Sequence, residues 1–364
     1  MKKVKAGIIG TGYTIGIAKQ HVEAYHANEQ AELVAMYDRI PGRAAAWAEE
    51  KKITGVTICG SLEELFAKVD AVSICTPNHT HIDLAIRAIE AGKHVICEKP
   101  YALSCEEGQL AVTCAKAHPG IVTAIGFNYR EIPAIRYMKE IMDSGKMGPV
   151  FYCRQELGGS RIANPSEVKL EWRMQEKLSG TGALADFGCH MLDLADYLLS
   201  GTQGKICEVQ AMCSTMIPER TLLDDENRKG AVTNDDCAVF NGKMENGTLL
   251  SFVSCRIGMP RQMMEIIGAG GMMLFHGNPN EVEVCFKDQN SGYAGTKREV
   301  IQVPEEFKGE EGHKGLVNEF IDAIIHGKQA VRNLERGLYI QSILDTLKRS
   351  ADEGKALKLE GNKG

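Results

Sequence analysis

The sequence predicts an α/β protein of two domains, a doubly wound parallel sheet followed by an α+β domain with a large, mostly antiparallel or mixed sheet. Three observations support this fold class. Apolar segments of strand length alternate with helical ones through the first third of the chain, a glycine-rich turn follows the first segment, and helical periodicity almost disappears over 206–303. We expect one domain over 1–126 and the second over 127–364.

The length and composition of the chain agree with two domains. Its 364 residues exceed what one hydrophobic core usually serves. A composition of 44% hydrophobic and 25% charged residues is typical of globular proteins. The formal net charge of -6 and the lack of a basic run argue against nucleic acid or an anionic membrane surface as a partner. The expected partner is a small neutral or weakly charged molecule.

The start of the chain and its cysteines indicate a cytoplasmic protein. No long apolar segment follows Met1, so we expect neither export nor membrane insertion. The 12 cysteines include no Cys-x-x-Cys pair, and most lie in apolar segments. We therefore expect reduced thiols, with no disulfide framework and no metal site.

A glycine-rich turn follows the first predicted strand, over 4–9, and precedes a helix predicted over 17–27. Glycines at such a turn let backbone amides approach a pyrophosphate at the helix N-terminus. The spacing to Gly16 is one residue longer than in the usual dinucleotide fingerprint, so phosphate binding and a plain turn both stay open. The expected cofactor contacts here are Gly10, Gly12, Tyr13, Thr14 and Ile15.

The second predicted strand, over 33–37, ends at Asp38. An acid at this distance from the glycines is placed to accept a hydrogen bond from a ribose hydroxyl, and its charge would repel a 2′-phosphate. Arg39 could accept that phosphate or stack on adenine. The pattern indicates a dinucleotide-binding Rossmann domain that uses NAD, with NADP possible.

Strands and helices then continue to alternate. Ser61 with Glu64 and Ser104 with Glu107 have the spacing of helix capping boxes. Alternation of this kind implies parallel crossovers. The expected helices are 41–51 and 104–117, and the expected strands are 71–75, 94–97 and 121–125.

Polar residues follow the strand predicted over 71–75. The carboxyl ends of parallel strands border the ligand crevice of an open sheet, so we expect this loop to face a cofactor. Its two histidines have no acid or thiol at ligand spacing, which favours a helix cap or a surface position over a metal site. The loop comprises Thr76, Pro77, Asn78, His79, Thr80 and His81.

Lys99 follows the strand predicted over 94–97, within Cys97-Glu98-Lys99-Pro100. The proline restricts Lys99 to extended backbone conformations, which fixes the direction of its stem. We interpret Lys99 as a catalytic proton donor and acceptor, although a Lys-Pro pair by itself is usually only a turn.

Four motifs together resemble the Gfo/Idh/MocA family, of the glucose-fructose oxidoreductase and inositol 2-dehydrogenase type. The resemblance implies a nicotinamide cofactor bound by the first domain, with Lys99 at the reacting carbon. It also implies that Glu98 and Asn128 lie at the cofactor and that Tyr129 and Arg130 contact substrate. The motifs are the glycine turn, Thr76-Pro77-Asn78 with His81, Glu98-Lys99-Pro100, and Gly126-Phe127-Asn128-Tyr129-Arg130.

An amphipathic helix is predicted over 184–199, where apolar residues recur at intervals of three and four. Asp186 and His190 are four apart and share one face, which is usually a solvated pair. Gly182 would let a ligand approach this helix closely. Residues 180–193 are similar to a second family signature, and this similarity implies that Asp186 and His190 face the substrate. Trp172 and Arg173 match a family pair near the cofactor.

The rest of the second domain reads as sheet and connecting loops. Strands are expected at 149–157 and on both sides of the Asn246-Gly247 hairpin and the 268–271 turn. Residues 218–234 and 288–296 are expected to be loops, and Tyr293 could touch substrate. Helices are predicted at 133–144, 313–326 and 334–352, and a loose tail at 354–364. The resemblance implies a homodimer or homotetramer formed through the sheet.

The expected reaction is reversible oxidation of a secondary alcohol on a sugar, a sugar derivative or a cyclitol. Hydride leaves only as the hydroxyl proton is removed, so a base must lie within hydrogen-bonding reach. Burial beside a cationic nicotinamide would disfavour the ammonium form of Lys99. His190 would share the proton or pass it on, and Asp186 would orient the histidine or hold a neighbouring hydroxyl. An NAD-dependent glycosidase that oxidises its sugar transiently and a non-catalytic nucleotide sensor stay open as alternatives, and the set of proton-transfer residues argues mainly against the sensor.

Overall fold

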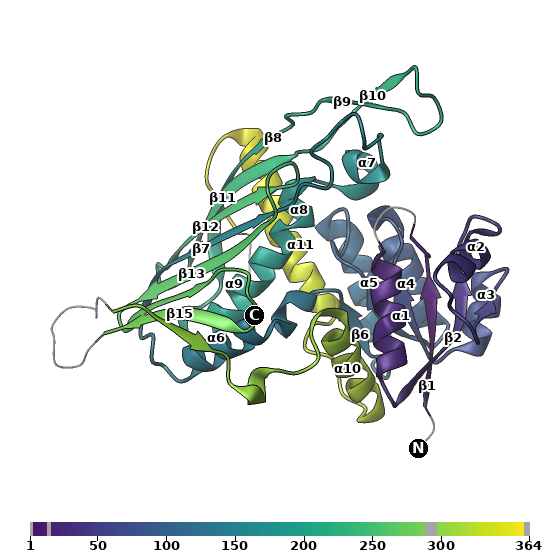
Figure 1. The fold of residues 1–364 in the computed structure, drawn as a ribbon, viewed down its shortest axis with the longest axis horizontal. Coiled ribbons are helices and arrows are strands. Elements are labelled where there is room, and N and C mark those ends of the chain that lie inside the picture. The colour runs from purple at the N-terminus through teal and green to yellow at the C-terminus, as the bar shows by residue number, and fades with distance from the viewer. Residues whose placement is uncertain (1–2, 13–15, 288–296, 360–364) are drawn as a thin grey trace. The chain divides into compact units, whose positions relative to one another are not determined.

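The computed structural model describes residues 3–12, 16–287 and 297–359. The chain divides into two compact units (Figure 1). The first unit combines residues 1–128 with 310–341, and the second combines 129–309 with 342–364.

A six-stranded parallel sheet forms the centre of the first unit, in the order β3-β2-β1-β4-β5-β6. This is the strand order of a doubly wound sheet, and it confirms the predicted fold class of this part of the chain. The central strands are apolar and buried, as expected for a parallel sheet that is covered on both faces. The strands are β1 Val4–Ile9, β2 Ala31–Tyr37, β3 Thr57–Ile58, β4 Ala71–Ile74, β5 His94–Cys97 and β6 Thr123–Ile125.

Two helices of this unit, α3 and α5, begin where the capping signals indicate. The Ser61 hydroxyl accepts a hydrogen bond from the Glu64 N–H, and the Ser104 hydroxyl accepts one from the Glu107 N–H, each at 3.1 Å. Both predicted N-caps are confirmed. The helices are α1 Ile17–Ala27, α2 Arg43–Glu50, α3 Leu62–Lys68, α4 His81–Glu90 and α5 Cys105–Ala117.

Residues 310–341 return to the first unit, which differs from the domain boundary expected at residue 126. Helix α10 (Gly312–Ile325) packs on α1, with Val317 and Phe320 buried in the same core as Val22 and Tyr25. Helix α11 (Leu334–Glu353) begins in the first unit and ends in the second. An amphipathic pattern shows that one face of a helix is buried, but not against which domain it packs. The sequence alone therefore did not indicate that residues 310–341 belong to the first unit.

A nine-stranded mixed sheet dominates the second unit, in the order β16-β15-β14-β13-β7-β12-β11-β8-β17. Neighbouring strands are antiparallel except β7 and β12, which run parallel, so the predicted mixed sheet is confirmed. The strands are β7 Val150–Gly158, β8 Ile206–Ser214, β11 Cys237–Met244, β12 Leu249–Cys255, β13 Arg261–Gly268, β14 Gly271–Phe275, β15 Glu281–Phe286, β16 Glu299–Gln302 and β17 Leu357–Lys358.

The hairpin turn of the second unit was predicted correctly, but two of its short strand pairings were not. The Asn246-Gly247 hairpin joins β11 to β12, with Gly247 in the left-handed region at φ 99°. The 218–234 segment is not only a loop, because it holds the two-stranded pair β9 (Glu219–Thr221) and β10 (Lys229–Ala231). The predicted loose tail is also wrong in part, since β17 pairs with β8. Residues 288–296, including Tyr293, lie outside the described residues.

Helices cover one face of the nine-stranded sheet (Figure 1). Helices α6 and α9 pack against each other, and α9 packs on β7 and β12. Within the described ranges, no helix is long and apolar enough to cross a membrane. The helices are α6 Pro133–Asp143, α7 Glu176–Ser179, α8 Ala183–Asp186 and α9 Gly188–Gln203.

Candidate functional site

The glycine-rich turn after β1 is held by Asp38, at the end of β2. The Asp38 Oδ2 atom accepts hydrogen bonds from the N–H and the hydroxyl of Thr11, at 3.1 and 3.0 Å. Gly10 and Gly12 have φ values of 87° and 66°, a conformation that favours glycine. A Cβ atom at Gly10 would lie 2.5 Å from the Thr76 side chain. The turn is therefore closely packed backbone that only glycine can form.

The residues around this turn fit a dinucleotide. The Asp38 carboxylate also accepts the Ile40 N–H, at 2.9 Å, and retains lone pairs for a ribose hydroxyl. Arg39 is exposed to solvent. The other expected contacts here, Tyr13, Thr14 and Ile15, lie outside the described residues.

His81 joins two loops at the carboxyl edge of the sheet. Its Nδ1 atom lies 2.9 Å from the Pro100 carbonyl oxygen, and its Nε2 atom lies 2.9 Å from that of Thr76. The ring is fully buried, so the expectation of a cap or a surface position is wrong for His81. Burial lowers the pKa of His81, and the two carbonyl oxygens oppose this shift. His81 thus ties the loop that carries Pro77 and Asn78 to the one that carries Lys99.

Glu98 is buried directly after β5, at the centre of a group of polar side chains. Its Oε1 atom lies 2.8 Å from His21 Nε2 and 3.0 Å from His313 Nε2. Its Oε2 atom accepts the Lys99 N–H, at 3.3 Å. Burial alone would raise the pKa of Glu98, but the hydrogen bonds from the two histidines hold it well below its usual range. His21 and His313 were not identified from the sequence.

Lys99 itself is half-buried at the carboxyl end of β5, and the Lys99–Pro100 peptide bond is cis. Asn128, another expected cofactor contact, lies with its Nδ2 atom 3.4 Å from His313 Nδ1. The first unit therefore gathers the glycine turn, the Thr76–His81 loop, Glu98, Lys99 and Asn128 on the loops that follow its parallel strands. This is the edge at which open parallel sheets bind their ligands.

Asp186 and His190 belong to the second unit and to two different helices. Helix α8 ends at Asp186 and α9 begins at Gly188, so the prediction of one uninterrupted helix is wrong. A Cβ atom at Gly188 would lie 3.3 Å from the ring of Phe240, and glycine is a poor helix former. Asp186 is half-buried, and His190 is buried in the first turn of α9.

Gly182, just before α8, is approached closely by the chain itself. A Cβ atom there would lie 1.8 Å from the Asp235 carbonyl oxygen. The Asp235 carboxylate accepts the N–H groups of Gly182 and Leu184, at 2.5 and 2.7 Å. The expectation that this glycine makes room for a ligand is therefore wrong, because the Asp235 backbone occupies the space.

Two residues with expected substrate contacts, Tyr129 and Arg130, have different surroundings. The ring of Tyr129 stacks on that of His190, with centroids 4.1 Å apart and an angle of 10° between the planes. The buried guanidinium of Arg130 forms a two-pronged ion pair with Asp193, at 2.7 and 2.5 Å, and lies over the ring of Tyr197. Arg130 thus anchors the start of the second unit to α9, whereas the ring of Tyr129 packs against the imidazole of His190.

Trp172 and Arg173 form a stacked pair, with the guanidinium carbon 4.2 Å from the indole centroid. Burial lowers the pKa of Arg173 to about 10, and the charge of Asp186 opposes this shift. The Arg173 carbonyl accepts hydrogen bonds from Asn234 and Arg256, each at 2.9 Å. The pair is thereby fixed within electrostatic range of Asp186.

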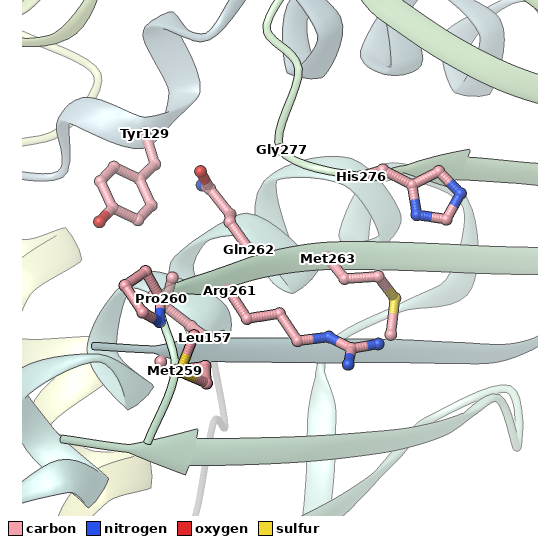
Figure 2. Close-up of a pocket in the computed structure, with 10 residues that line it drawn as sticks. Tyr129, Leu157, Met259, Pro260, Arg261, Gln262, Met263, His276 and Gly277 are labelled. Carbon is pink, nitrogen blue, oxygen red and sulfur yellow. The ribbon is translucent and has the colours of Figure 1, made fainter. Parts of the chain in front are cut away.

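A cleft of about 710 Å³ opens beside Tyr129 in the second unit (Figure 2). Figure 2 shows the side chain of Gln262 extending on the side of Tyr129, while that of Arg261 extends in the opposite direction. Arg261 pairs with Glu156 at 2.7 Å, and His276 lies 3.3 Å from a Glu283 oxygen. The lining residues are Tyr129, Leu157, Gly158, Met259, Pro260, Arg261, Gln262, Met263, His276 and Gly277.

Sequence reasoning missed most of this cleft, because its residues come from the ends of β7, β13 and β14, which are far apart along the chain. The start of β13 carries the adjacent polar residues Arg261 and Gln262, but many exposed strand ends carry similar residues. Of the lining residues, only Tyr129 was among the expected substrate contacts.

His21, Glu98 and His313 are also, among the described residues, the one group of three side chains that could hold a metal ion. Their ligand atoms lie within 4.8 Å of one another. The distances from Glu98 Oε1 to the two histidine nitrogens are those of hydrogen bonds, which explain the arrangement without an ion.

A doubly wound sheet with a dinucleotide turn, followed by a mixed-sheet domain, defines a nucleotide-dependent oxidoreductase. The family models agree with this class. Residues 4–125 match the "Oxidoreductase family, NAD-binding Rossmann fold", and residues 135–274 match the "GFO/IDH/MocA C-terminal domain". The chain belongs to the Gfo/Idh/MocA family, and its first domain is an NAD-binding Rossmann domain.

Several relatives of this chain are named sugar dehydrogenases. Levoglucosan dehydrogenase of Pseudarthrobacter phenanthrenivorans is 34% identical over 242 residues, which cover 62% of this chain and 60% of that protein. Glucose-6-phosphate 3-dehydrogenase of Bacillus subtilis is 28% identical over 77% of this chain and 76% of that protein. A structure of levoglucosan dehydrogenase with NADH and L-sorbose superposes with a TM-score of 0.87, at 27% identity over 99% of both chains.

Proposed function

We propose that this protein is a dehydrogenase that oxidises a secondary hydroxyl of a neutral sugar, such as a pyranose or its glycoside, with NAD as the hydride acceptor. The observation that carries the proposal is Lys99, half-buried beside Glu98 at the carboxyl end of β5 in an NAD-binding domain. A cyclitol is a chemically equivalent substrate, because its ring carries the same secondary alcohols.

The charge of the cleft supports a neutral sugar over a sugar phosphate. Its basic side chains, Arg261 and His276, each lie beside a carboxylate, from Glu156 and Glu283 respectively. A phosphate would have to compete with these carboxylates. The Asp38 carboxylate at the end of β2 likewise disfavours the 2′-phosphate of NADP.

In the proposed reaction Lys99 accepts the hydroxyl proton of the substrate. A nicotinamide cofactor held at the glycine turn and Asp38 would supply the hydride acceptor. His190 takes part in proton transfer, and the ring of Tyr129 stacks on its imidazole. Asp186 holds a neighbouring hydroxyl of the sugar or orients His190.

A panel of sugars, glycosides, polyols and cyclitols, assayed with NAD and with NADP, tests this proposal. Absorbance of the reduced nicotinamide and release of an aryl leaving group would be followed together. We expect reduction of NAD by neutral sugars, and a higher KM for the chosen sugar in Gln262→Ala with the Kd for NADH unchanged. Release of the leaving group without net NADH would instead identify a glycosidase.

We also propose that the uncovered face of the nine-stranded sheet joins copies of the chain into a homodimer or homotetramer. Val239 and Met212 lie opposite each other on β11 and β8, and Met212 is 76% exposed. Leu249 and Phe151 on the two central strands are more than half exposed as well. Exposed apolar surface of this extent favours association. Light scattering after chromatography should show an oligomer for the wild type and a smaller species for Met212→Glu.

The cytoplasm is the compartment that we propose for this enzyme. All twelve cysteines are free thiols, and Cys213 is exposed. Thiols of this kind persist where glutathione and thioredoxin keep them reduced. Localisation of a tagged protein by cell fractionation tests this assignment.

A further inference from the structure

Glu98 is a buried carboxylate that is held by hydrogen-bond donors from three parts of the first unit. His21 comes from α1, His313 from α10, and the third donor is the N–H of Lys99. We infer that His21 and His313 are positioning residues that keep Glu98 ionised and fix the backbone from which the Lys99 side chain extends. This inference rests on the proposed role of Lys99 as the base.

The hydrogen bonds define the tautomer of each histidine. Both rings approach Oε1 of Glu98 through Nε2, so Nε2 carries the proton in each. Nδ1 of His313 is then an acceptor that faces the Asn128 amide, at 3.4 Å. Nδ1 of His21 is buried with no hydrogen-bond partner in the described part of the chain, and a proton placed there would be buried without an acceptor. His21 therefore acts as a neutral donor, in agreement with burial lowering its pKa.

The backbone is shaped to admit the carboxylate. A Cβ atom at Gly126 would lie 2.8 Å from both oxygens of Glu98, so any other residue at this position would displace the group. Glu98, His21 and His313 are each at least 95% buried. A carboxylate removed from water to this extent stays ionised only if donors replace the lost solvation.

The other titratable groups around Glu98 do not replace these donors. The thiols of Cys75 and Cys97 are buried, and burial raises the pKa of each, so they remain neutral. The two ring nitrogens of His81 face carbonyl oxygens instead of Glu98. The groups that face Glu98 from the surrounding elements are His21, His313, His81, Cys75, Cys97 and Lys99.

The test compares glutamine and leucine substitutions at the two histidines. Glutamine places an N–H near the position of Nε2, whereas leucine provides none. Infrared spectra at several pH values would report the ionisation of Glu98, with Glu98→Gln identifying its signal. We expect an ionised Glu98 at neutral pH in the wild type, His21→Gln and His313→Gln, and a protonated one in the double leucine variant. If the double leucine variant does not fold, the same spectra of His21→Leu and His313→Leu provide the test.

Activity gives a second readout. A higher pH should ionise Glu98 again in the leucine variants. Relative to the wild type, their loss of kcat/KM should therefore be about ten-fold larger at about pH 6 than at about pH 9. His94→Asn is the matched control, since His94 lies at the opposite end of β5 and uses Nδ1 to accept the Val122 N–H, at 2.9 Å. Its pH profile should equal that of the wild type.

Three results would overturn the inference: an unchanged Glu98 signal in all leucine variants, an equal loss of activity at every pH, or a stoichiometric metal ion in the purified protein. Absence of any sugar oxidation in the wild type would instead refute the proposed function. The infrared measurement needs no turnover, so it still decides whether the histidines hold Glu98 ionised.

Discussion

The rings of Tyr129 and His190 stack at 4.1 Å, with only 10° between their planes. His190 lies in the first turn of α9, and Tyr129 lines the adjacent cleft. This contact links the lining of the cleft to the residue that we propose as a proton carrier.

Loss of this stack should impair the reaction. Tyr129→Leu should lower kcat/KM about ten-fold, because an aromatic pair contributes about 1 kcal/mol and its loss frees the imidazole to rotate. Tyr129→Phe keeps the ring and should stay within about two-fold of wild type. Steady-state kinetics with the chosen sugar check this. An equal loss in both variants would assign the effect to the hydroxyl and contradict the role of the stack.

Gly10→Ala should weaken NADH binding at least ten-fold. The added methyl group would lie 2.5 Å from the Thr76 side chain, at a φ value that costs about 1 kcal/mol for alanine. Gly42→Ala is the control, since Gly42 has a φ of 78° but no atom within 4 Å of the added methyl group. Fluorescence titration with NADH measures both. Equal affinities of the two variants would contradict the assignment of the turn to the cofactor.

Gly182→Ala should destabilise the second unit by several kcal/mol, on the order of a severely overpacked core position. The methyl group would lie 1.8 Å from the Asp235 carbonyl oxygen, so the entry to α8 must move. Gly201→Ala, inside α9 with open space around the site, should instead be neutral or stabilising by about 1 kcal/mol. Chemical denaturation provides the comparison. A Gly182→Ala variant as stable as wild type would show that the space is not filled as described.

Acid should destabilise the first unit through His21. Burial lowers the pKa of His21 from 6.5 in the folded protein. As the pH falls below about 6.5, the imidazole is therefore protonated in the unfolded chain before it is protonated in the folded one, and the free energy of unfolding decreases. The glutamine side chain of His21→Gln does not titrate in this pH range. Its free energy of unfolding should therefore fall less than that of the wild type between about pH 6.5 and 5, by up to about 1.4 kcal/mol per pH unit. Parallel denaturation curves over this range would contradict a neutral His21.

Local signals predicted most elements of the fold. The hydroxyls of Ser61 and Ser104 begin helices as expected, and Asn246-Gly247 forms the expected hairpin. Each depends on residues within a few positions of one another, so a single sequence contains the necessary information.

The site depends on contacts that no local pattern contains. His21 and His313 are separated from Glu98 by 77 and 215 positions, and their own helices look ordinary in sequence. The expected substrate role of Arg130 did not anticipate Asp193, its partner 63 residues away. Motif order is the basis for proposing Lys99 and His190, but it did not indicate that the ring of Tyr129 stacks on His190 or that two histidines contact Glu98.

The most direct test of the central claim is turnover by Lys99→Met, which removes the ammonium group and keeps the stem. Lys116→Met, on the exposed face of α5, is the control. The account predicts at least about a hundred-fold loss of kcat with NADH affinity within about two-fold of wild type, since general-base catalysis contributes factors of about 10²–10⁴. Sugar oxidation by Lys99→Met at a rate close to that of Lys116→Met would contradict it.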